Sequence, residues 1–170
     1  MKPWLAMTVV LVALVLVTGA AAGCGAKPAA REPSAAPPAA AAAPGPQSND
    51  ILAREPVANH AEVKHILISW RDLGAPRGGS IDPRAEARSR EDAEALIQEL
   101  SARIAKGEPF EALMAEYSED GGSARTGESF DVTPDAPLVL DFKRLSLRLE
   151  VGEIGVVLTD FGLHIIKRVA

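Results

Sequence analysis

Two short β-prone runs, which stand 99 positions apart and each carry one histidine, constrain the fold of this chain most strongly. The first run is VKHILI at Val63–Ile68, and the second is LHII at Leu163–Ile166. A histidine that is buried in a strand needs a hydrogen-bond partner, because an unpaired polar group costs free energy away from water. Two strands at opposite ends of one small domain can supply that partner to each other. The two runs are therefore candidates for strands whose histidines pair.

The first 23 residues are typical of an export signal and are not expected to belong to the fold. Lys2 precedes an apolar stretch from Trp4 to Val17, and small residues then continue to Cys24. A basic start, an apolar core and a small-residue end are the features of a bacterial secretory signal. Small residues before a lone cysteine resemble the lipobox of bacterial lipoproteins, although Ala21 stands where that family usually has leucine. We therefore predict a signal peptide over residues 1–23 and lipidation of Cys24.

Two other processing routes fit the same segment. Residues 4–23 reach the roughly 20 that an uncleaved transmembrane anchor needs, and ordinary cleavage near Ala22 would release the chain. All three routes place the remainder outside the cytoplasm. In the lipidated form, Gly25 after the cysteine, in place of Asp, favours the outer membrane, with the domain facing the periplasm.

Residues 24–59 are predicted to form a solvated membrane tether. They are rich in Ala and Pro and have few large apolar side chains, so they cannot bury a core. Residues 60–170 suffice for one compact domain, which we expect to be a monomer. Between residues 61 and 170, 14 Lys and Arg stand against 20 Asp and Glu, a net charge of −6. That charge argues against nucleic acid as a partner.

The pattern after residue 60 predicts an α+β domain in which helices cover a small four-stranded sheet. Expected strands are Glu62–Trp70, a short one near Phe130, Val156–Thr159 and His164–Val169. Ser89-Arg90-Glu91-Asp92 has the form of a capping box, which opens a helix that continues through Lys106. A second helix is expected to carry Phe110, Leu113, Met114 and Tyr117 on one face, and further helical turns are expected over Asp141–Leu149.

Five short motifs follow one another along this domain. They are KHILI at residues 64–68, GEPFEAL at 107–113, YSEDGGSA at 117–124, VGEI at 151–154 and DFGLHIIK at 160–167. Together they resemble the parvulin family of peptidyl-prolyl cis–trans isomerases, over roughly Glu62 to Val169. The resemblance implies an isomerase of X-Pro bonds that needs no metal, nucleotide or other cofactor and forms no covalent intermediate. Its partners would be proline-containing polypeptide clients among exported proteins.

The resemblance also implies a role for each residue that matches a family position. His65 and His164 correspond to the paired histidines at the floor of the family's active site. Asp120 falls where members have Asp or Cys beside the reacting amide, and Thr159 falls at the hydroxyl that bonds the histidine pair. The apolar pocket for the proline ring would consist of Leu138, Phe142, Phe161 and Phe130.

One segment departs from the family pattern and keeps a second function open. Most members have GGDLG after the Ser-Ala turn, whereas this chain has TGESFD at Thr126–Asp131. The backbone beside the pocket is therefore expected to differ. A remodelled pocket would suit a parvulin-fold module that binds unfolded or partner polypeptides without isomerising them well. A third possibility, an envelope scaffold lipoprotein, leaves the pocket residues unexplained.

Several of these residues have plainer interpretations when each is considered alone. Asp120 in Asp-Gly-Gly is an ordinary turn-capping residue, and isolated buried histidines are more often satisfied core residues than catalytic ones. The two histidines and Asp120 have the ligand types of a zinc site, but no metal-binding spacing supports one. The arginines of residues 71–90 are dispersed among acids, which favours a solvated loop over a phosphate-binding cluster.

Overall fold

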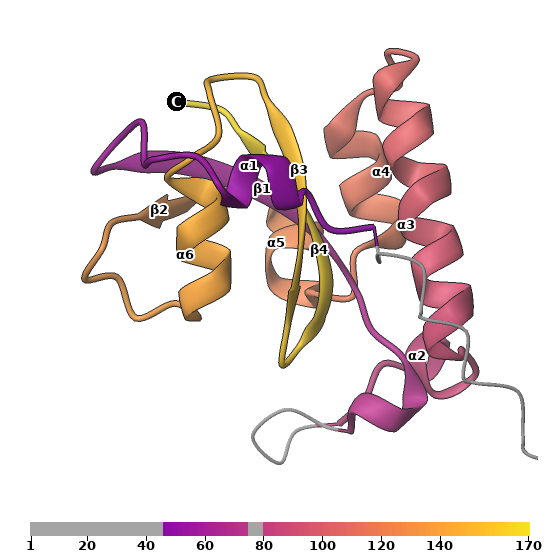
Figure 1. Ribbon diagram of the computed structural model, residues 1–170. Helices are drawn as coiled ribbons and strands as arrows, with labels where there is room; N and C mark the ends of the chain where they lie inside the picture. Colours follow the sequence, from indigo (N-terminus) through magenta and orange to yellow (C-terminus); the bar gives the residue numbers. More distant parts are fainter. Residues whose placement is uncertain (1–45, 75–79) are drawn as a thin grey trace, which may run out of the picture. The chain divides into compact units, whose positions relative to one another are not determined.

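Four antiparallel strands form one sheet in the computed structural model, which describes residues 46–74 and 80–170. The strands are β1 (Ala61–Ile68), β2 (Phe130–Val132), β3 (Ile154–Thr159) and β4 (Gly162–Arg168), and their order in the sheet is β2-β1-β4-β3. The predicted four-stranded sheet is therefore confirmed. The two histidine-bearing strands, β1 and β4, are its central pair (Figure 1).

The helices are α1 (Asn49–Leu52), α2 (Pro83–Glu86), α3 (Arg90–Ala105), α4 (Phe110–Tyr117), α5 (Gly121–Thr126) and α6 (Leu140–Ser146), with a 3₁₀ turn at Arg71–Leu73. The predicted capping box opens α3: Ser89 Oγ accepts from the Asp92 N–H, and the Asp92 carboxylate accepts from the Ser89 N–H. Helix α5 was not predicted, because two glycines in succession favour a turn. Asp120 starts it by accepting a hydrogen bond from the Gly122 N–H at its N-cap.

Helices cover both faces of the sheet, so alternate residues of each strand enter two different cores. Figure 1 shows α3 and α4 on one face and α6 on the other. Ile66 and Ile165 pack towards α3 and α4, whereas Val63 and Ile166 pack towards α6. Because side chains alternate along a strand, His65 and His164 share the face that α6 covers.

Residues 47–58, which the sequence assigned to the tether, pack against the sheet and α6. Ser48 exchanges two hydrogen bonds with Val156 on the outer edge of β3, at 2.9 and 3.0 Å. The Ile51 side chain is buried in the core beneath α6, and Arg54 forms an ion pair with Glu153 at 2.8 Å. The folded part therefore begins before the predicted boundary at residue 60. A single buried isoleucine in a polar stretch has no periodicity that would reveal it.

The predicted signal peptide, Cys24 and the first part of the predicted tether lie outside the described residues. In the two described stretches, no helix is both long enough and apolar enough to span a membrane.

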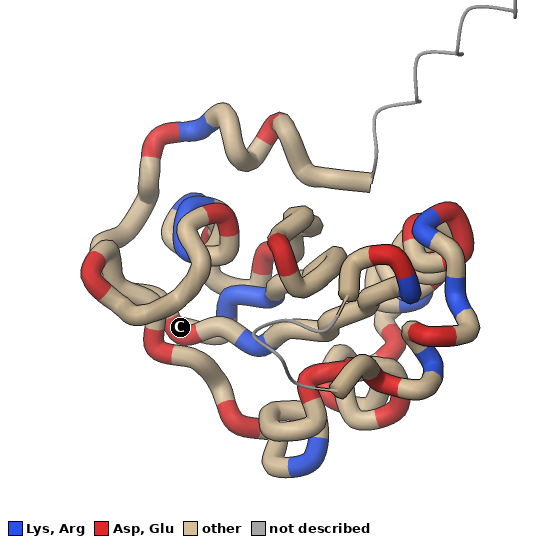
Figure 2. Tube along the Cα trace, turned by 90° about the horizontal axis from the view of Figure 1, so that it is seen from below, with Lys and Arg blue, Asp and Glu red and all other residues tan. Residues whose placement is uncertain are grey.

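Acidic and basic residues are interspersed along the trace (Figure 2). Several form ion pairs near the surface, among them Arg54–Glu153, Arg90–Glu94 and Arg103–Glu108. Exposed pairs of this kind contribute little to stability. The two hydrophobic cores therefore account for the fold, and most of the surface charge does not.

Candidate active site

The two predicted histidines meet beneath α6. In the register of β1 and β4, His65 lies opposite Ile166 and His164 lies opposite Leu67, so the two histidines are diagonal neighbours on one face. Their Nδ1 atoms are 2.9 Å apart and their rings are stacked, with centroids 5.2 Å apart. Each histidine is only 4% exposed. The need for a buried partner, which the sequence raised, is thus met by the other histidine.

Asp120 and Thr159 occupy the two ends of this pair. His65 Nε2 lies 2.9 Å from Asp120 Oδ2, and His164 Nε2 lies 2.8 Å from Thr159 Oγ1. The four predicted polar residues therefore form one continuous chain of hydrogen bonds. Ser123, which is not among the predicted site residues, places its Oγ 3.4 Å from His65 Nε2. The only sequence signal for Ser123 is its place in the YSEDGGSA motif.

The acceptor-only character of a carboxylate assigns the proton at the Asp120 end of this chain. The hydrogen bond from His65 lowers the pKa of Asp120 to about 2, so Asp120 is ionised at neutral pH and His65 Nε2–H donates to it. Burial and the nearby His65 lower the pKa of His164 to about 3, so His164 is neutral. A neutral His164 carries one N–H, which lies either on Nδ1, facing His65 Nδ1, or on Nε2, facing Thr159 Oγ1.

An apolar cavity of about 460 Å³ opens above this network. Both histidines, Asp120 and all four predicted pocket residues line it: Leu138, Phe142, Phe161 and Phe130. The Phe130 and Phe142 rings meet the His65 ring edge-on, at centroid distances of 5.0 and 5.3 Å. Thr159 is not among the lining residues. It lies below the floor, where its hydroxyl also accepts from the Phe161 N–H at 3.1 Å.

The segment that departs from the family pattern supplies one wall of this cavity. Gly127, with φ of +71°, ends α5 in the left-handed conformation that glycine favours. The chain then enters β2, where Phe130 pairs with Val63 of β1. The Glu128 side chain is exposed and does not line the cavity. The altered connection therefore retains an aromatic wall, although its route differs.

Residues that the sequence did not predict also line the cavity. They include Leu67 and Ser69 at the end of β1, Ser80, Ile81 and Asp82 before α2, and Glu119. The prediction of a solvated arginine loop is wrong for Arg88, whose side chain is only 13% exposed, whereas the Arg84 side chain is 45% exposed. Arg84 and Arg88 donate to carboxylates and backbone carbonyls beside the cavity.

The fold and this site define a peptidyl-prolyl isomerase domain. The sequence pattern of the PPIC-type PPIase domain matches residues 50–169, which is more than half of the chain. The chain therefore belongs to the PPIC-type PPIase family, and its resemblance to the parvulins is confirmed.

Two curated relatives are folding factors. The chain is 40% identical over 75 residues to foldase protein PrsA of Geobacillus kaustophilus, and this match covers 44% of this chain and 27% of the relative. It is 41% identical over 81 residues to chaperone SurA of Chromohalobacter salexigens, and this match covers 47% of this chain and 19% of the relative. The matched part is thus about a quarter or less of the length of these relatives.

Solved structures share the fold. The solution structure of TbPIN1 superimposes with a TM-score of 0.56 at 30% identity, over 67% of this chain and 100% of that one. The PPIase domain of TbPAR42 superimposes with a TM-score of 0.52 at 27% identity, over 65% of this chain and 99% of that one. Both structures therefore correspond to the described domain almost from end to end.

Proposed function

We propose that this protein is a peptidyl-prolyl cis–trans isomerase that assists the folding of exported proteins. The observation that carries the proposal is the apolar cavity set directly on the Asp120–His65–His164–Thr159 chain of hydrogen bonds. Its volume lies within the range of sites that bind small groups. Membership in the PPIC-type PPIase family and similarity to a foldase and a chaperone support the same function.

The chemistry follows from the electronic structure of the amide. A planar X-Pro amide carries partial negative charge on oxygen and partial positive charge on nitrogen, and twisting the C–N bond removes that resonance at a cost of about 18–20 kcal/mol. A catalyst must therefore favour the twisted amide over both planar forms. An ionised carboxylate beside the carbonyl oxygen disfavours the charge-separated planar form. Each roughly 1.4 kcal/mol of such preference gives a tenfold faster exchange.

Different residues would bind the proline ring, supply the negative charge and orient the carboxylate. Leu138, Phe142, Phe161 and Phe130 would hold the proline ring while the preceding carbonyl swings. Asp120 would supply the charge, because it is only partly buried and faces the cavity. The two histidines and Thr159 would keep Asp120 oriented and would fill the floor of the cavity.

Exchange spectroscopy by NMR on an Ala-Pro peptide tests the proposal. The chain should accelerate cis–trans exchange when it is present well below the peptide concentration. A chain cut at residue 46 is the appropriate soluble form, since residues 47–58 contact the sheet. Peptide shift changes without faster exchange, at equimolar protein, would contradict the isomerase and would support the binding module that Thr126–Asp131 kept open.

The proposed location rests on the N-terminal sequence. Export through residues 1–23, lipidation at Cys24 and a tether towards the outer membrane would bring the monomeric domain to clients near the membrane surface. Labelling with radioactive palmitate should mark the wild-type chain and leave the Cys24→Ala variant unmarked. Label on the variant would contradict lipidation at Cys24.

A further inference from the structure

The segment that carries Asp120 is fastened to the end of β1 by several hydrogen bonds. The Glu119 N–H donates to the Leu67 carbonyl at 2.9 Å, and the Ser69 N–H donates to Glu119 Oε2 at 2.7 Å. The next residue, Asp120, bonds His65 on the same strand. The position of Asp120 over the histidine pair therefore depends on how firmly its own segment is held.

A buried ion pair holds the Glu119 side chain. Its carboxylate is 2% exposed, and Arg88 Nη1 donates to it at 2.5 Å and to the Ser69 carbonyl at 2.8 Å. A buried charge is tolerated only when it is paired and its hydrogen bonds are satisfied. Here both carboxylate oxygens have a donor. Removal of Arg88 would leave a buried charge without its partner, so this pair is a poor place for a test variant.

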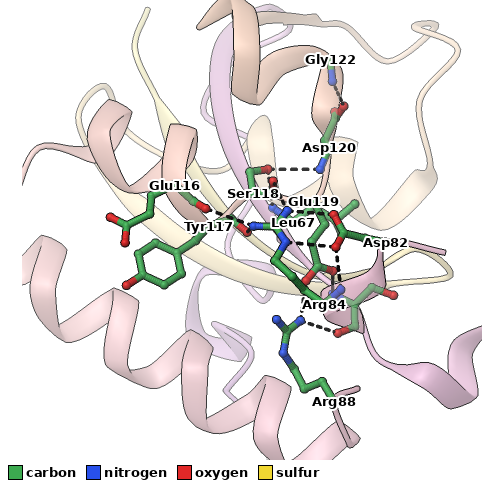
Figure 3. Close-up of polar contacts among 11 residues, drawn as sticks. Leu67, Asp82, Arg84, Arg88, Glu116, Tyr117, Ser118, Glu119, Asp120 and Gly122 are labelled. Atoms are coloured by element: carbon green, nitrogen blue, oxygen red, sulfur yellow. Dashed lines mark hydrogen bonds and ion pairs between the residues drawn. The ribbon is translucent and has the colours of Figure 1, made fainter. Parts of the chain in front are cut away.

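Arg84 also holds this segment, through its backbone carbonyls (Figure 3). Its guanidinium donates to the carbonyls of Glu116, Tyr117 and Ser118, at 3.1, 3.3 and 3.1 Å. These carbonyls stand at the end of α4, where a helix has no intrahelical donors left for them. A planar guanidinium can satisfy several such acceptors at once, whereas an ammonium group cannot do so in a fixed geometry.

The opposite edge of the Arg84 guanidinium is held by Asp82. Arg84 Nε and Nη2 donate to the two Asp82 oxygens at 3.0 and 2.9 Å, and the same carboxylate caps α2 by accepting from the Arg84 N–H at 2.8 Å. Asp82 and Glu119 both line the cavity. Arg84 thus joins a wall of the cavity to the segment that ends in Asp120.

We propose that Arg84 is a positioning residue, which keeps the Asp120 carboxylate at hydrogen-bond distance from His65 by holding the carbonyls of residues 116–118. This inference rests on the proposed isomerase function. It also assigns a role to an arginine of α2 in a segment for which the sequence predicts only a solvated loop. Because the Arg84 side chain is 45% exposed, its loss buries no unpaired charge, and the variant is expected to fold.

Arg103 offers a matched control for Arg84. It also contacts the α4 region, since it donates to the Tyr117 hydroxyl at 2.9 Å and to Glu108. Its hydrogen bonds and ion pairs reach Glu99, Glu108 and Tyr117, and none of those in the described part of the chain reaches residues 118–120. In the full-length chain in detergent, Arg84→Gln should lower kcat for an Ala-Pro peptide about five- to tenfold and leave KM within about twofold, because small displacements of a reacting group are costly. Arg103→Gln should keep both constants within about twofold of wild type. Equal losses of kcat in the two variants, at equal loss of stability, would overturn the proposal.

The Asp120→Ala chain distinguishes a positioning role of Arg84 from a general loss of stability. If Arg84 acts through Asp120, Arg84→Gln should cause no further loss of kcat in an Asp120→Ala chain, because coupled residues are not additive. The same fold loss in both backgrounds would assign Arg84 a merely structural role.

The histidine nitrogens give a readout that does not need activity. In a chain labelled with ¹⁵N-histidine, Arg84→Gln should shift the His65 Nε2–H signal and leave the exposed His60 signal unchanged. An unchanged His65 signal would overturn the positioning role. A wild-type chain that accelerates no exchange would instead overturn the proposed function, so the two failures can be told apart.

Discussion

His164 shows how a single residue couples this site to stability. Its pKa is lowered from 6.5 to about 3 by burial and by His65, so the folded chain excludes a proton that the unfolded chain takes up below pH 6.5. The unfolded state therefore binds more protons between these two values, and folding stability falls as the pH falls. Above pH 6.5, the contribution of His164 is fully present.

We expect the free energy of unfolding to drop by about 2 kcal/mol between pH 7 and pH 5 on account of His164, since each pH unit in this window contributes up to about 1.4 kcal/mol. Urea unfolding at both pH values measures the drop. The His164→Gln variant, whose side chain does not titrate, should lose this part of the pH dependence while being less stable at pH 7. An identical slope in the variant would contradict the assignment.

Asp120 makes a separate prediction about rate. Asp120→Asn keeps the shape of the side chain and removes its charge, so exchange of an Ala-Pro peptide should slow about a hundred- to a thousandfold, the range found when one electrostatic group is lost. Asp131→Asn, at an exposed carboxylate of the neighbouring β2, is the control and should leave the rate unchanged. Since the pKa of Asp120 is about 2, its ionisation should not limit the rate between pH 5 and pH 8. Equal rates for Asp120→Asn and wild type would contradict its role.

At the scale of elements, the hairpin of β3 and β4 decides whether the histidines can meet. Gly162 starts β4 with φ of +136°, and a Cβ built there would lie 2.5 Å from the Ile68 carbonyl oxygen on β1. The close approach of these two strands is what brings His164 next to His65. No side chain can be accommodated at position 162 without moving the backbone of β1 or β4.

Gly162→Ala should therefore destabilise the protein by about 3 kcal/mol or more, the size expected for backbone strain combined with a steric clash. Gly152→Ala is the matched control, because Gly152 has a φ of +85° but nothing within 4 Å of its Cβ position. That variant should cost only about 1–2 kcal/mol, from the backbone conformation alone. Urea unfolding of both variants measures the difference, and equal losses would show that the contact with Ile68 is unimportant.

At the scale of the whole molecule, the residues before β1 complete the domain. Ser48 bonds the outer edge of β3, and Ile51 fills the core beneath α6. An uncovered edge strand promotes association with other chains. The N-terminal contacts therefore protect an edge and add core at the same time.

A chain that starts at residue 59 should be less stable than one that starts at residue 46, by about 2–4 kcal/mol, from the burial of Ile51 and the lost hydrogen bonds. It should also aggregate more readily during thermal unfolding. A chain that starts at residue 25 serves as the control and should match the one that starts at 46, since residues 24–45 are predicted to be solvated. Urea unfolding and light scattering check both points. Equal stability of the two shorter chains would contradict a structural role for residues 46–58.

The sequence by itself determined the strands, the capped helix and the polar residues of the site. These features are local or periodic: alternation marks β1 and β4, Ser89 and Asp92 mark the start of α3, and five ordered motifs mark the family. The sequence could also state that two buried histidines need partners. It contained no local signal for α5, whose glycines disfavour a helix that the Asp120 cap nevertheless starts.

Only the tertiary structure decided which distant segments contact one another around the cavity. The contacts of Arg84 with residues 116–118, of Arg88 with Glu119 and of Ser48 with Val156 join segments far apart in the chain. Such contacts depend on the geometry of packed elements and leave no periodic pattern behind. For the same reason, Thr126–Asp131 looked like a disrupted wall in the sequence, whereas the sheet register places Phe130 beside His65. The residue types could be predicted locally, but their arrangement around the cavity required the fold.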